Sequence, residues 1–399
     1  MTDYTRKLES RIEEFADDAY SEEEILSYLT DASSFLDFGR SLRRFIRERM
    51  RPDDPRSERA YLEELAAAQQ ITFNRNTLRS WFEGTAPKRG DSDRERMFQI
   101  CFALGCSEPE TEHFFRKVYG DRPFNMRSCR EFVYYCCLRN GWTYGEARDL
   151  LGQVSFPEEK TDLTVYTGVL QQEATDLRTK EAVLSYLAAN GHNFDLRNRT
   201  AKETLKRLLE QVRGRKGEEK LLEEGRVDAS CSIIARECAA DPYLWESFKM
   251  ASGEKKTKKS LYSVSTMVDL IYGIDVNRAR QEERGGAFLK NANLPKQIRS
   301  RLPVVQSFTK ADPTAEELRK MIILLYSYWF WFSKKQGGHH TDLENYRESL
   351  NDLLCEAYLQ PLYAGNPFDW FFLYCETAED SLDLFRDLIS EGLLADERM

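Results

Sequence analysis

The sequence predicts an all-α protein, on three observations. Apolar residues recur at spacings of three and four along most of the chain, as on one face of a helix. Capping boxes and glycines stand where helices would begin and end. Sustained alternation of apolar and polar residues is nearly absent, and residues 163–170 and 232–235 are the only short candidates for strands.

The first amphipathic helix is predicted from an apolar stripe that begins at Phe38 and ends at Ile46. Arg43, Arg44 and Arg47 fall on its polar side. Further helices are expected over residues 61–69, 75–83, 93–104 and 108–119. Gly105 and Gly120 follow the last two, where a C-terminal glycine is favoured.

Later helices carry start signals of their own. Capping boxes are predicted at Thr143–Glu146 and Thr200–Glu203, and a helix start at Asp312–Pro313. Residues 129–151 form a helix pair that turns at Asn140-Gly141, and it lacks the basic cluster of a second DNA reader. Dense apolar helices are expected over 322–332, 350–362 and 366–375, the last capped by Asn366 or Asp369.

The C-terminal aromatic residues leave three uses open. Trp329, Trp331, Trp370, Phe371 and Phe372 are expected to build a hydrophobic core. An aromatic-lined pocket for an effector is one alternative, and a dimerisation surface is another.

Length and composition fit a folded protein of several domains. The 399 residues are 41% hydrophobic and 31% charged, which excludes a mainly disordered or collagen-like chain. We expect an acidic N-terminal helical segment (1–36), a DNA-binding domain (37–120), a helical domain (121–225) and a C-terminal helical domain (226–399).

Membrane and secretion signals are not visible in the sequence. The longest apolar run, from Met321 to Phe332, is too short for a span, and no apolar segment follows the first residues. The nine cysteines are odd in number and include no CxxC pair, which indicates reduced thiols in a cytoplasmic protein. We expect at most one of Cys136 and Cys137 to face inward, and Cys231 and Cys238 to share a helical face.

Charge is distributed unevenly along the chain. The net charge is −9, yet residues 40–96 hold 14 basic and 10 acidic side chains. Residues 1–39 hold 3 basic and 11 acidic side chains, so this segment is a candidate shield for the basic one.

One short segment carries a specific pattern. Over residues 75–83, Leu78, Trp81 and Phe82 define an apolar face. Arg75, Asn76, Arg79 and Glu83 fall on the opposite face, after the cap residue Asn74, and a short helix precedes them. An exposed face with Arg and Asn suits the major groove, since Arg pairs with guanine and Asn with adenine.

This segment resembles the helix-turn-helix of the bacterial Xre/Cro-like phage-repressor family, over residues 37–119. The matching positions are Ala68, Phe73, Asn74, Thr77, Leu78, Gly84, Pro87, Leu104 and Gly105. Thr72 departs from the family glycine, so the backbone there must avoid or strain into positive φ, and the 52–57 loop is long. The C-terminal region resembles uncharacterised bacterial helical proteins, which implies no activity.

The resemblance implies a five-helix domain that binds double-stranded DNA and regulates transcription, as a homodimer on two-fold operators. Arg75, Asn76, Arg79 and Ser80 would read bases. Phosphates would be held by Arg43, Arg44, Arg47, Lys88 and Arg89. A small molecule or protein could act as effector at the C-terminal region.

The same residues are also compatible with other functions. Arg79 and Glu83, four apart, are also typical of an ion pair on a solvated surface. The alternative function is a protein-interaction or scaffold protein of a mobile-element or phage-response system, whose helix-turn-helix binds protein. No metal motif, phosphate-binding glycine loop or nucleophile motif accompanies the four histidines, so we expect no enzyme, cofactor or metal.

Overall fold

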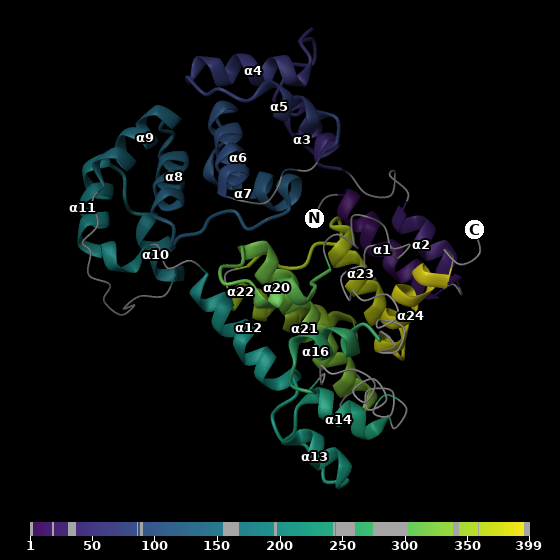
Figure 1. Ribbon diagram of the computed structural model, residues 1–399. Helices are drawn as coiled ribbons and strands as arrows, with labels where there is room; N and C mark the ends of the chain where they lie inside the picture. The colour runs from purple at the N-terminus through teal and green to yellow at the C-terminus, as the bar shows by residue number, and fades with distance from the viewer. Residues whose placement is uncertain are drawn as a thin grey trace. The chain divides into compact units, whose positions relative to one another are not determined.

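The computed structural model describes residues 3–17, 20–30, 37–85, 87, 91–154, 167–194, 198–241, 244, 260–273, 302–337, 343–357 and 359–394. Every regular element within these ranges is a helix, so the all-α prediction is confirmed (Figure 1). None of the described helices is long and apolar enough to cross a bilayer.

The chain forms two compact units. Unit 1 comprises Met1–Phe35, Thr200–Ala357 and Pro361–Met399, and unit 2 comprises Leu36–Arg199 with Tyr358–Gln360. Unit 2 is therefore an insertion between two parts of unit 1. The four-part division made from the sequence stays a prediction.

Unit 2 contains the segment with the specific pattern. Its helices are α3 (Phe38–Arg47), α4 (Glu58–Ala68), α5 (Arg75–Phe82), α6 (Asp91–Ala103), α7 (Glu108–Phe114), α8 (Cys129–Asn140), α9 (Tyr144–Gln153), α10 (Thr167–Ala174) and α11 (Lys180–Asn190). A π-helical turn, η1 (Phe115–Tyr119), continues α7, and a 3-10 turn, η2 (Gly191–Asn193), continues α11.

Local signals explain where these helices begin and end. Thr143 caps α9 in the predicted capping box, its hydroxyl accepting from the Glu146 N–H. Gly105 and Gly120 adopt left-handed φ values of +63° and +72° at the ends of α6 and η1. The glycine and capping-box predictions at these positions are thus confirmed.

One hydrophobic core runs through unit 2, from Phe38 to Phe194. Helix α8 lies within it, with α7, α9, α10 and α11 packed around it. Cys136 and Cys137 are both fully buried, so the expectation that at most one faces inward is wrong. Because helices surround α8, it has two buried sides instead of one.

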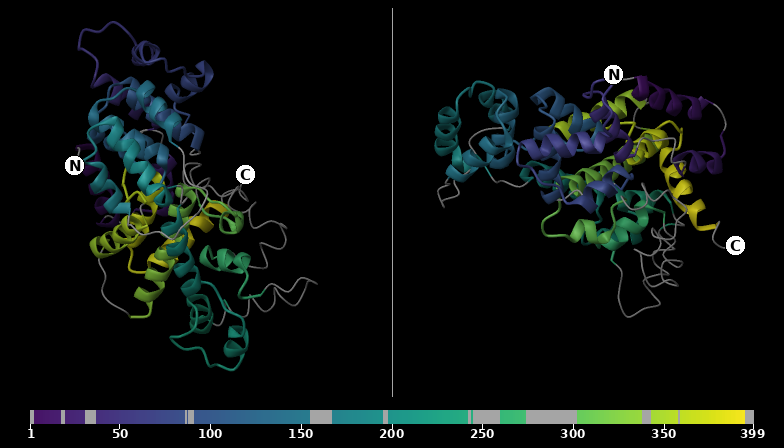
Figure 2. Two further views of the ribbon diagram at one scale, coloured as in Figure 1. Left: turned by 90° about the vertical axis from the view of Figure 1, so that its left-hand side faces the viewer. Right: turned by 90° about the horizontal axis from the view of Figure 1, so that it is seen from above.

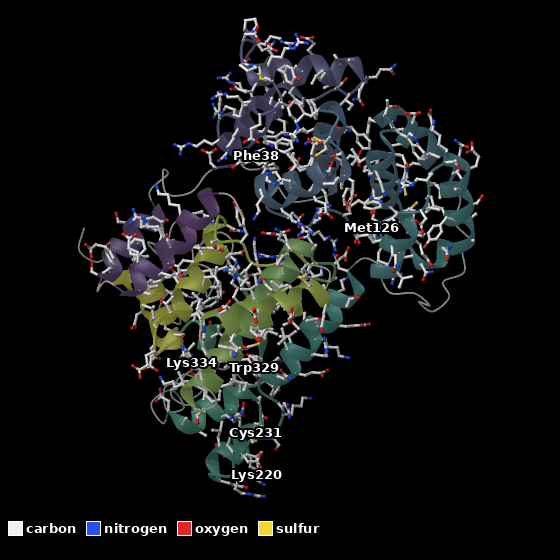
Figure 3. All side chains as sticks on the ribbon, turned by 180° about the vertical axis from the view of Figure 1, so that it is seen from behind. Phe38, Met126, Lys220, Cys231, Trp329 and Lys334 are labelled. Carbon is white, nitrogen blue, oxygen red and sulfur yellow. The ribbon has the colours of Figure 1, made fainter. Side chains whose placement is uncertain are left out.

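Unit 1 is built around a long helix, α21 (Ala315–Lys335), which carries Trp329 and Lys334 (Figure 3). The other helices are α1 (Asp3–Asp17), α2 (Glu22–Thr30), α12 (Arg199–Val212), α13 (Glu218–Glu223), α14 (Ile233–Ala240), α16 (Val264–Ile271), α20 (Val305–Thr309), α22 (Leu343–Glu356), α23 (Pro367–Glu376) and α24 (Ser381–Leu394). Trp331, Trp370, Phe371 and Phe372 are buried as expected, and Trp329 is half-buried.

The acidic N-terminal helices belong to unit 1. Helices α1 and α2 lie beside α23 and α24 (Figures 1 and 2). The Trp370 indole N–H donates to the Leu8 carbonyl at 3.4 Å, and the rings of Phe15 and Trp370 are 5.9 Å apart. The acidic segment thus has a packing partner of its own within unit 1.

Buried ion pairs hold α21 to α23. Two Arg319 nitrogens donate to the Asp369 carboxylate at 2.8 and 2.7 Å, and both side chains are buried. Asn366 caps α23 through the Phe368 N–H, which leaves Asp369 for this pair. Between the two predicted caps, the structure therefore selects Asn366.

Two predicted helix starts are wrong. Helix α12 begins at Arg199, so Thr200 lies inside the helix and cannot cap it. Helix α21 is capped by Thr314, whose N–H donates to the Glu317 carboxylate at 2.7 Å. This reciprocal capping box satisfies two backbone N–H groups, and it displaces the start expected at Asp312–Pro313.

The strand candidates are wrong where the structure describes them. Ser232 is the cap of α14, and its hydroxyl accepts from the Ala235 N–H at 3.2 Å. Residues 167–170 begin α10, while 163–166 lie outside the described residues. Cys231 precedes α14, so it does not share a helical face with Cys238.

Candidate nucleic-acid interface

Helix α5 begins at a strong local signal. The Asn74 side-chain oxygen accepts from the N–H groups of Asn76 and Thr77 at 3.0 and 3.1 Å. These are two of the N–H groups that lack a partner within the helix itself. The predicted cap is confirmed, and it fixes the direction in which α5 leaves the turn.

The turn between α4 and α5 accommodates Thr72, which stands where the helix-turn-helix pattern has glycine. The left-handed residue of this turn is Gln70, with φ +57°, and Thr72 keeps negative φ. The Ile71 N–H donates to the Ala66 carbonyl at 2.9 Å, closing the end of α4, and Ile71 is buried. The residue at positive φ therefore lies two positions earlier than the resemblance predicted.

Close packing against α3 holds α5 in place. Leu78, Trp81 and Phe82 are buried, as predicted. A Cβ atom on Gly39 would lie 2.6 Å from the Trp81 carbonyl oxygen, so only glycine fits where α3 passes the end of α5. The Arg43 Nη2 also donates to the Phe82 carbonyl at 2.5 Å, which satisfies a carbonyl at the end of α5.

The opposite side of α5 is open to solvent. Arg75, Asn76, Arg79 and Glu83, here called the reading face, are all exposed, with 68% exposure for the Arg79 side chain. The Arg79 Nε lies 2.7 Å from a Glu83 carboxylate oxygen, and this contact raises the pKa of Arg79. Among the described residues, Arg75 has no ion-pair partner.

Ser80 differs from the other predicted base-reading residues. It is half-buried, and its hydroxyl donates to the Thr77 carbonyl at 2.9 Å. Its proton is therefore used within α5, and its oxygen can only accept from a ligand.

The predicted phosphate-binding arginines on α3 are already paired. Arg44 contacts Glu48 at 3.1 Å, and Arg47 contacts Glu58 across the loop to α4. Arg43 is half-buried and bonds the Phe82 carbonyl. Lys88 and Arg89 lie outside the described residues.

A cleft of about 600 Å³ opens beside α3. Its described lining is Arg40, Arg43, Arg44, Arg47 and Glu48. Sequence reasoning missed Arg40, although it lies four and seven residues before Arg44 and Arg47, spacings that share a helical face.

The charge count along the sequence does not show how many arginines form ion pairs with carboxylates. Arg49 contacts Glu110, Arg56 contacts Asp54 and Glu64, and Arg59 contacts Glu63. The spacing of four predicted the Arg79–Glu83 pair, which is confirmed, and the same spacing could have revealed Arg44–Glu48 and Arg59–Glu63.

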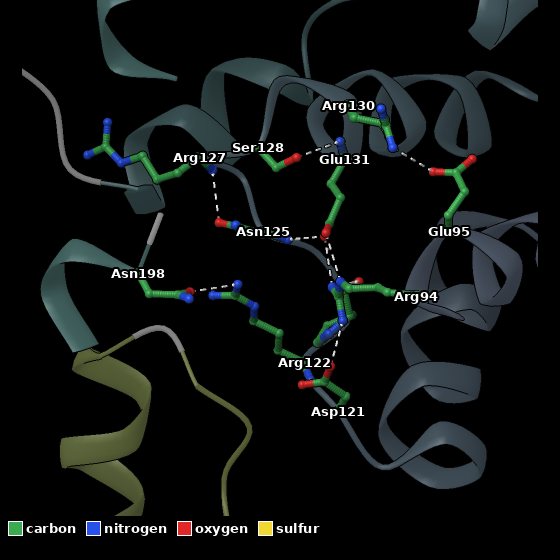
Figure 4. A network of polar contacts seen from close by, with 11 residues as sticks. Arg94, Glu95, Asp121, Arg122, Asn125, Arg127, Ser128, Arg130, Glu131 and Asn198 are labelled. Carbon is green, nitrogen blue, oxygen red and sulfur yellow. Dashed lines mark hydrogen bonds and ion pairs between the residues drawn. The ribbon is translucent and has the colours of Figure 1, made fainter. Parts of the chain in front are cut away.

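A buried polar network connects α6 to α8 (Figure 4). Arg94 donates to both Glu131 oxygens at 2.7 Å and to Asp121 at 2.8 Å. The Asn125 N–H adds a bond to Glu131 at 2.6 Å. Burial favours the neutral acid, but the Arg94 charge holds the pKa of Glu131 below its usual value.

This network ties α6 and α7 to the helices that follow residue 120. Arg122 Nη2 donates to the Asn198 side chain at 2.9 Å, and Arg127 Nη1 donates to the Asn193 carbonyl at 2.9 Å. Buried charged groups need all of their ion-pair partners, because an unpaired buried charge destabilises the folded state. Helix α6 and the segment 121–127 are thereby joined to α8 and to η2, which continues α11.

The described residues hold no group of three or more His, Cys, Asp or Glu side chains that could bind a metal ion. His113 stacks on Phe45, with the ring centres 6.2 Å apart, and burial lowers the pKa of His113.

Comparison of the chain with protein-family models, with characterised proteins and with solved structures gave no match.

Proposed function

We propose that this chain is a sequence-specific DNA-binding regulator whose helix α5 enters the major groove. The observation that carries the proposal is the division of α5 into two faces. Leu78, Trp81 and Phe82 are buried, while Arg75, Asn76 and Arg79 stand in solvent. The resemblance of residues 37–119 to the Xre/Cro-like family supports the same use of this helix.

The dimensions and chemistry of α5 suit a major groove. An α-helix with its side chains is about 10–12 Å across, and the groove of B-DNA is about 12 Å wide. Arg75 and Arg79 offer forked donors for guanine, and Asn76 offers a donor and an acceptor for adenine. Ser80 would accept from a base amino group.

Phosphate contacts are assigned to two exposed arginines of α3 and to two basic residues that follow α5 in the sequence. Arg44 and Arg47 would exchange Glu48 and Glu58 for DNA phosphates, and Lys88 and Arg89 would add to them. Such contacts fix the register of the protein on DNA without reading sequence. Arg43 supports α5 through its bond to the Phe82 carbonyl.

Regulators of this kind work in pairs. Two-fold operators place two half-sites about one helical turn apart, so we propose a homodimer in the cytoplasm. Unit 1 would supply the dimer contact or bind an effector.

Selection of DNA from a random pool by the full-length chain tests the proposal, followed by fluorescence polarisation. The double substitution Arg75→Ala with Arg79→Ala should abolish preference for the selected DNA. Arg44→Ala should weaken binding to all sequences alike and reduce the salt slope by about one. Lys206→Ala, on an exposed site of α12 in unit 1, is the charge-matched control and should bind as wild type.

A second candidate, a protein-interaction or scaffold protein, is favoured by one observation. Carboxylates partner Arg44, Arg47 and Arg79 on the surface of unit 2, as on many protein-binding surfaces. Failure to enrich any DNA at low salt would support this candidate over the regulator.

A further inference from the structure

The ion pair on the reading face leaves one edge of Arg79 available. Its Nε lies 2.7 Å from Glu83, and both side chains are exposed, at 68% and 58%. Within the described part of the chain, neither Nη group has an acceptor. A guanidinium has five N–H donors in one plane, so using Nε leaves the end with two parallel donors.

Those two donors match one base. Guanine presents O6 and N7 side by side in the major groove, and both are acceptors. Adenine presents an acceptor beside a donor, which cannot pair with two N–H groups. The free end of Arg79 is therefore complementary to guanine and not to adenine.

Glu83 restricts how Arg79 can turn. A long arginine side chain loses rotamer freedom when it binds, and a partner that holds it beforehand reduces that loss. Arg75, on the same face, has no such partner among the described residues. The two arginines therefore differ in preorganisation although both are exposed.

We infer that Arg79, positioned by Glu83, reads a guanine in the bound DNA. This inference rests on the proposed DNA-binding function and adds how Glu83 holds Arg79 for the guanine that it recognises. Glu83 acts as a positioning residue, since its contact is with Arg79.

Glu83 should also have a second, opposite effect. Its negative charge lies on the surface that approaches DNA, so it repels phosphates generally. Glu83→Gln should raise affinity for random DNA and at the same time lower the preference for guanine. A surface ion pair with no positioning role would change only the affinity for random DNA.

The test uses full-length protein and DNA selected by the wild type from a random pool. Each base pair of the selected site is changed in turn, and affinity is measured by fluorescence polarisation at one salt concentration. Wild type, Arg79→Lys, Glu83→Gln and the matched control Arg226→Lys are compared; Arg226 is an exposed arginine of unit 1 that contacts Glu224. Circular dichroism of each variant checks folding, which exposed substitutions should preserve.

For the wild-type protein, replacing one particular G·C pair of the selected site by A·T should lower the affinity about tenfold. Arg79→Lys keeps the charge but lacks the planar fork, so it should weaken that discrimination. Glu83→Gln should reduce it severalfold while random DNA binds more tightly. Arg226→Lys should leave it intact.

Three results would overturn the inference in different ways. If DNA is enriched but Arg79→Lys discriminates guanine as wild type does, Arg79 does not read guanine. If Glu83→Gln does so, the positioning role is wrong, and in both cases DNA binding stands. If the wild type enriches no DNA, the inference and the proposed function fail together.

Discussion

Helices α5 and α8 lie in the same unit and present contrasting surfaces. In α5, three residues are buried and the reading face is exposed. In α8, nine of 12 residues are buried, including Cys136 and Cys137. A spaced apolar stripe thus marks a helix with a free face, and a continuous apolar run marks one enclosed by neighbours.

The comparison also separates two uses of arginine. Arg79 pairs with Glu83 in solvent, where an ion pair contributes little to stability. Arg94 pairs with Glu131 and Asp121 in the interior, where loss of one partner leaves a buried charge. The exposed pair can exchange partners for a ligand, and the buried network maintains the fold.

Thiol labelling should show the largest contrast between the two helices. A cysteine introduced as Asn76→Cys on α5 should react at the rate of a free thiol. Cys136 should react at least about 10³-fold more slowly, since labelling requires unfolding, and burial raises the pKa of Cys136 to about 12. Mass spectrometry of labelled peptides measures both rates, and comparable rates would refute the enclosure of α8.

Breaking the buried network should have the next largest effect. Glu131→Ala removes two of the carboxylate contacts of buried Arg94 and leaves only Asp121 to balance its charge, so we expect a loss of about 3 kcal/mol in the free energy of unfolding. Arg79→Ala, which breaks the exposed pair, should leave it nearly unchanged. Urea titration followed by hydrogen exchange of α8 amides gives both values. Equal losses would contradict the distinction between the pairs.

The packing of α5 on α3 should be sensitive to one methyl group. Gly39→Ala would place a Cβ 2.6 Å from the Trp81 carbonyl, which should cost about 1–3 kcal/mol. Gly152→Ala, in α9 and with open space around it, should be neutral or stabilise by up to about 1 kcal/mol. Thermal unfolding separates the two variants, and similar melting temperatures would argue against this close contact.

The cap of α9 should give the smallest effect. The Lys180 ammonium and the Thr143 N–H lower the pKa of Glu146 to about 2. Because the folded pKa is depressed, the stabilisation is present above the unfolded pKa of 4.5 and is lost as pH falls towards 2.

Glu146→Gln should therefore cost about 0.5 kcal/mol at pH 7, and the difference from wild type should disappear near pH 2. Urea midpoints measured from pH 7 to pH 2 test this. A difference that grows as the pH falls would mean that the carboxylate is not the stabilising form.

Much of unit 2 could be predicted from the sequence because its signals are local. The Asn74 cap, the Thr143–Glu146 box and the Gly105 end each depend on a few neighbouring residues. The buried and exposed faces of α5 follow from helical periodicity alone. The base-reading role of the exposed residues stays a prediction.

Long-range contacts could not be predicted in this way. The partners of Arg94 are 27 and 37 residues away in sequence, and no periodic pattern connects them. Arg43 was expected to bind phosphate, but its bond to the Phe82 carbonyl depends on how α3 crosses α5. The left-handed conformation of Gln70 also depends on the residue at which α4 ends. Several end signals compete for that position.

The docking of α1 against α23 has a consequence during translation. Leu8 and Trp370 are 362 residues apart, and at about 5–20 residues per second they leave the ribosome roughly 20–70 s apart. All of the residues of α3–α11 are synthesised within that interval. The nascent chain therefore carries Leu8, Ile12 and Phe15 without their final partner, so a chaperone that binds apolar helices would find its target on α1.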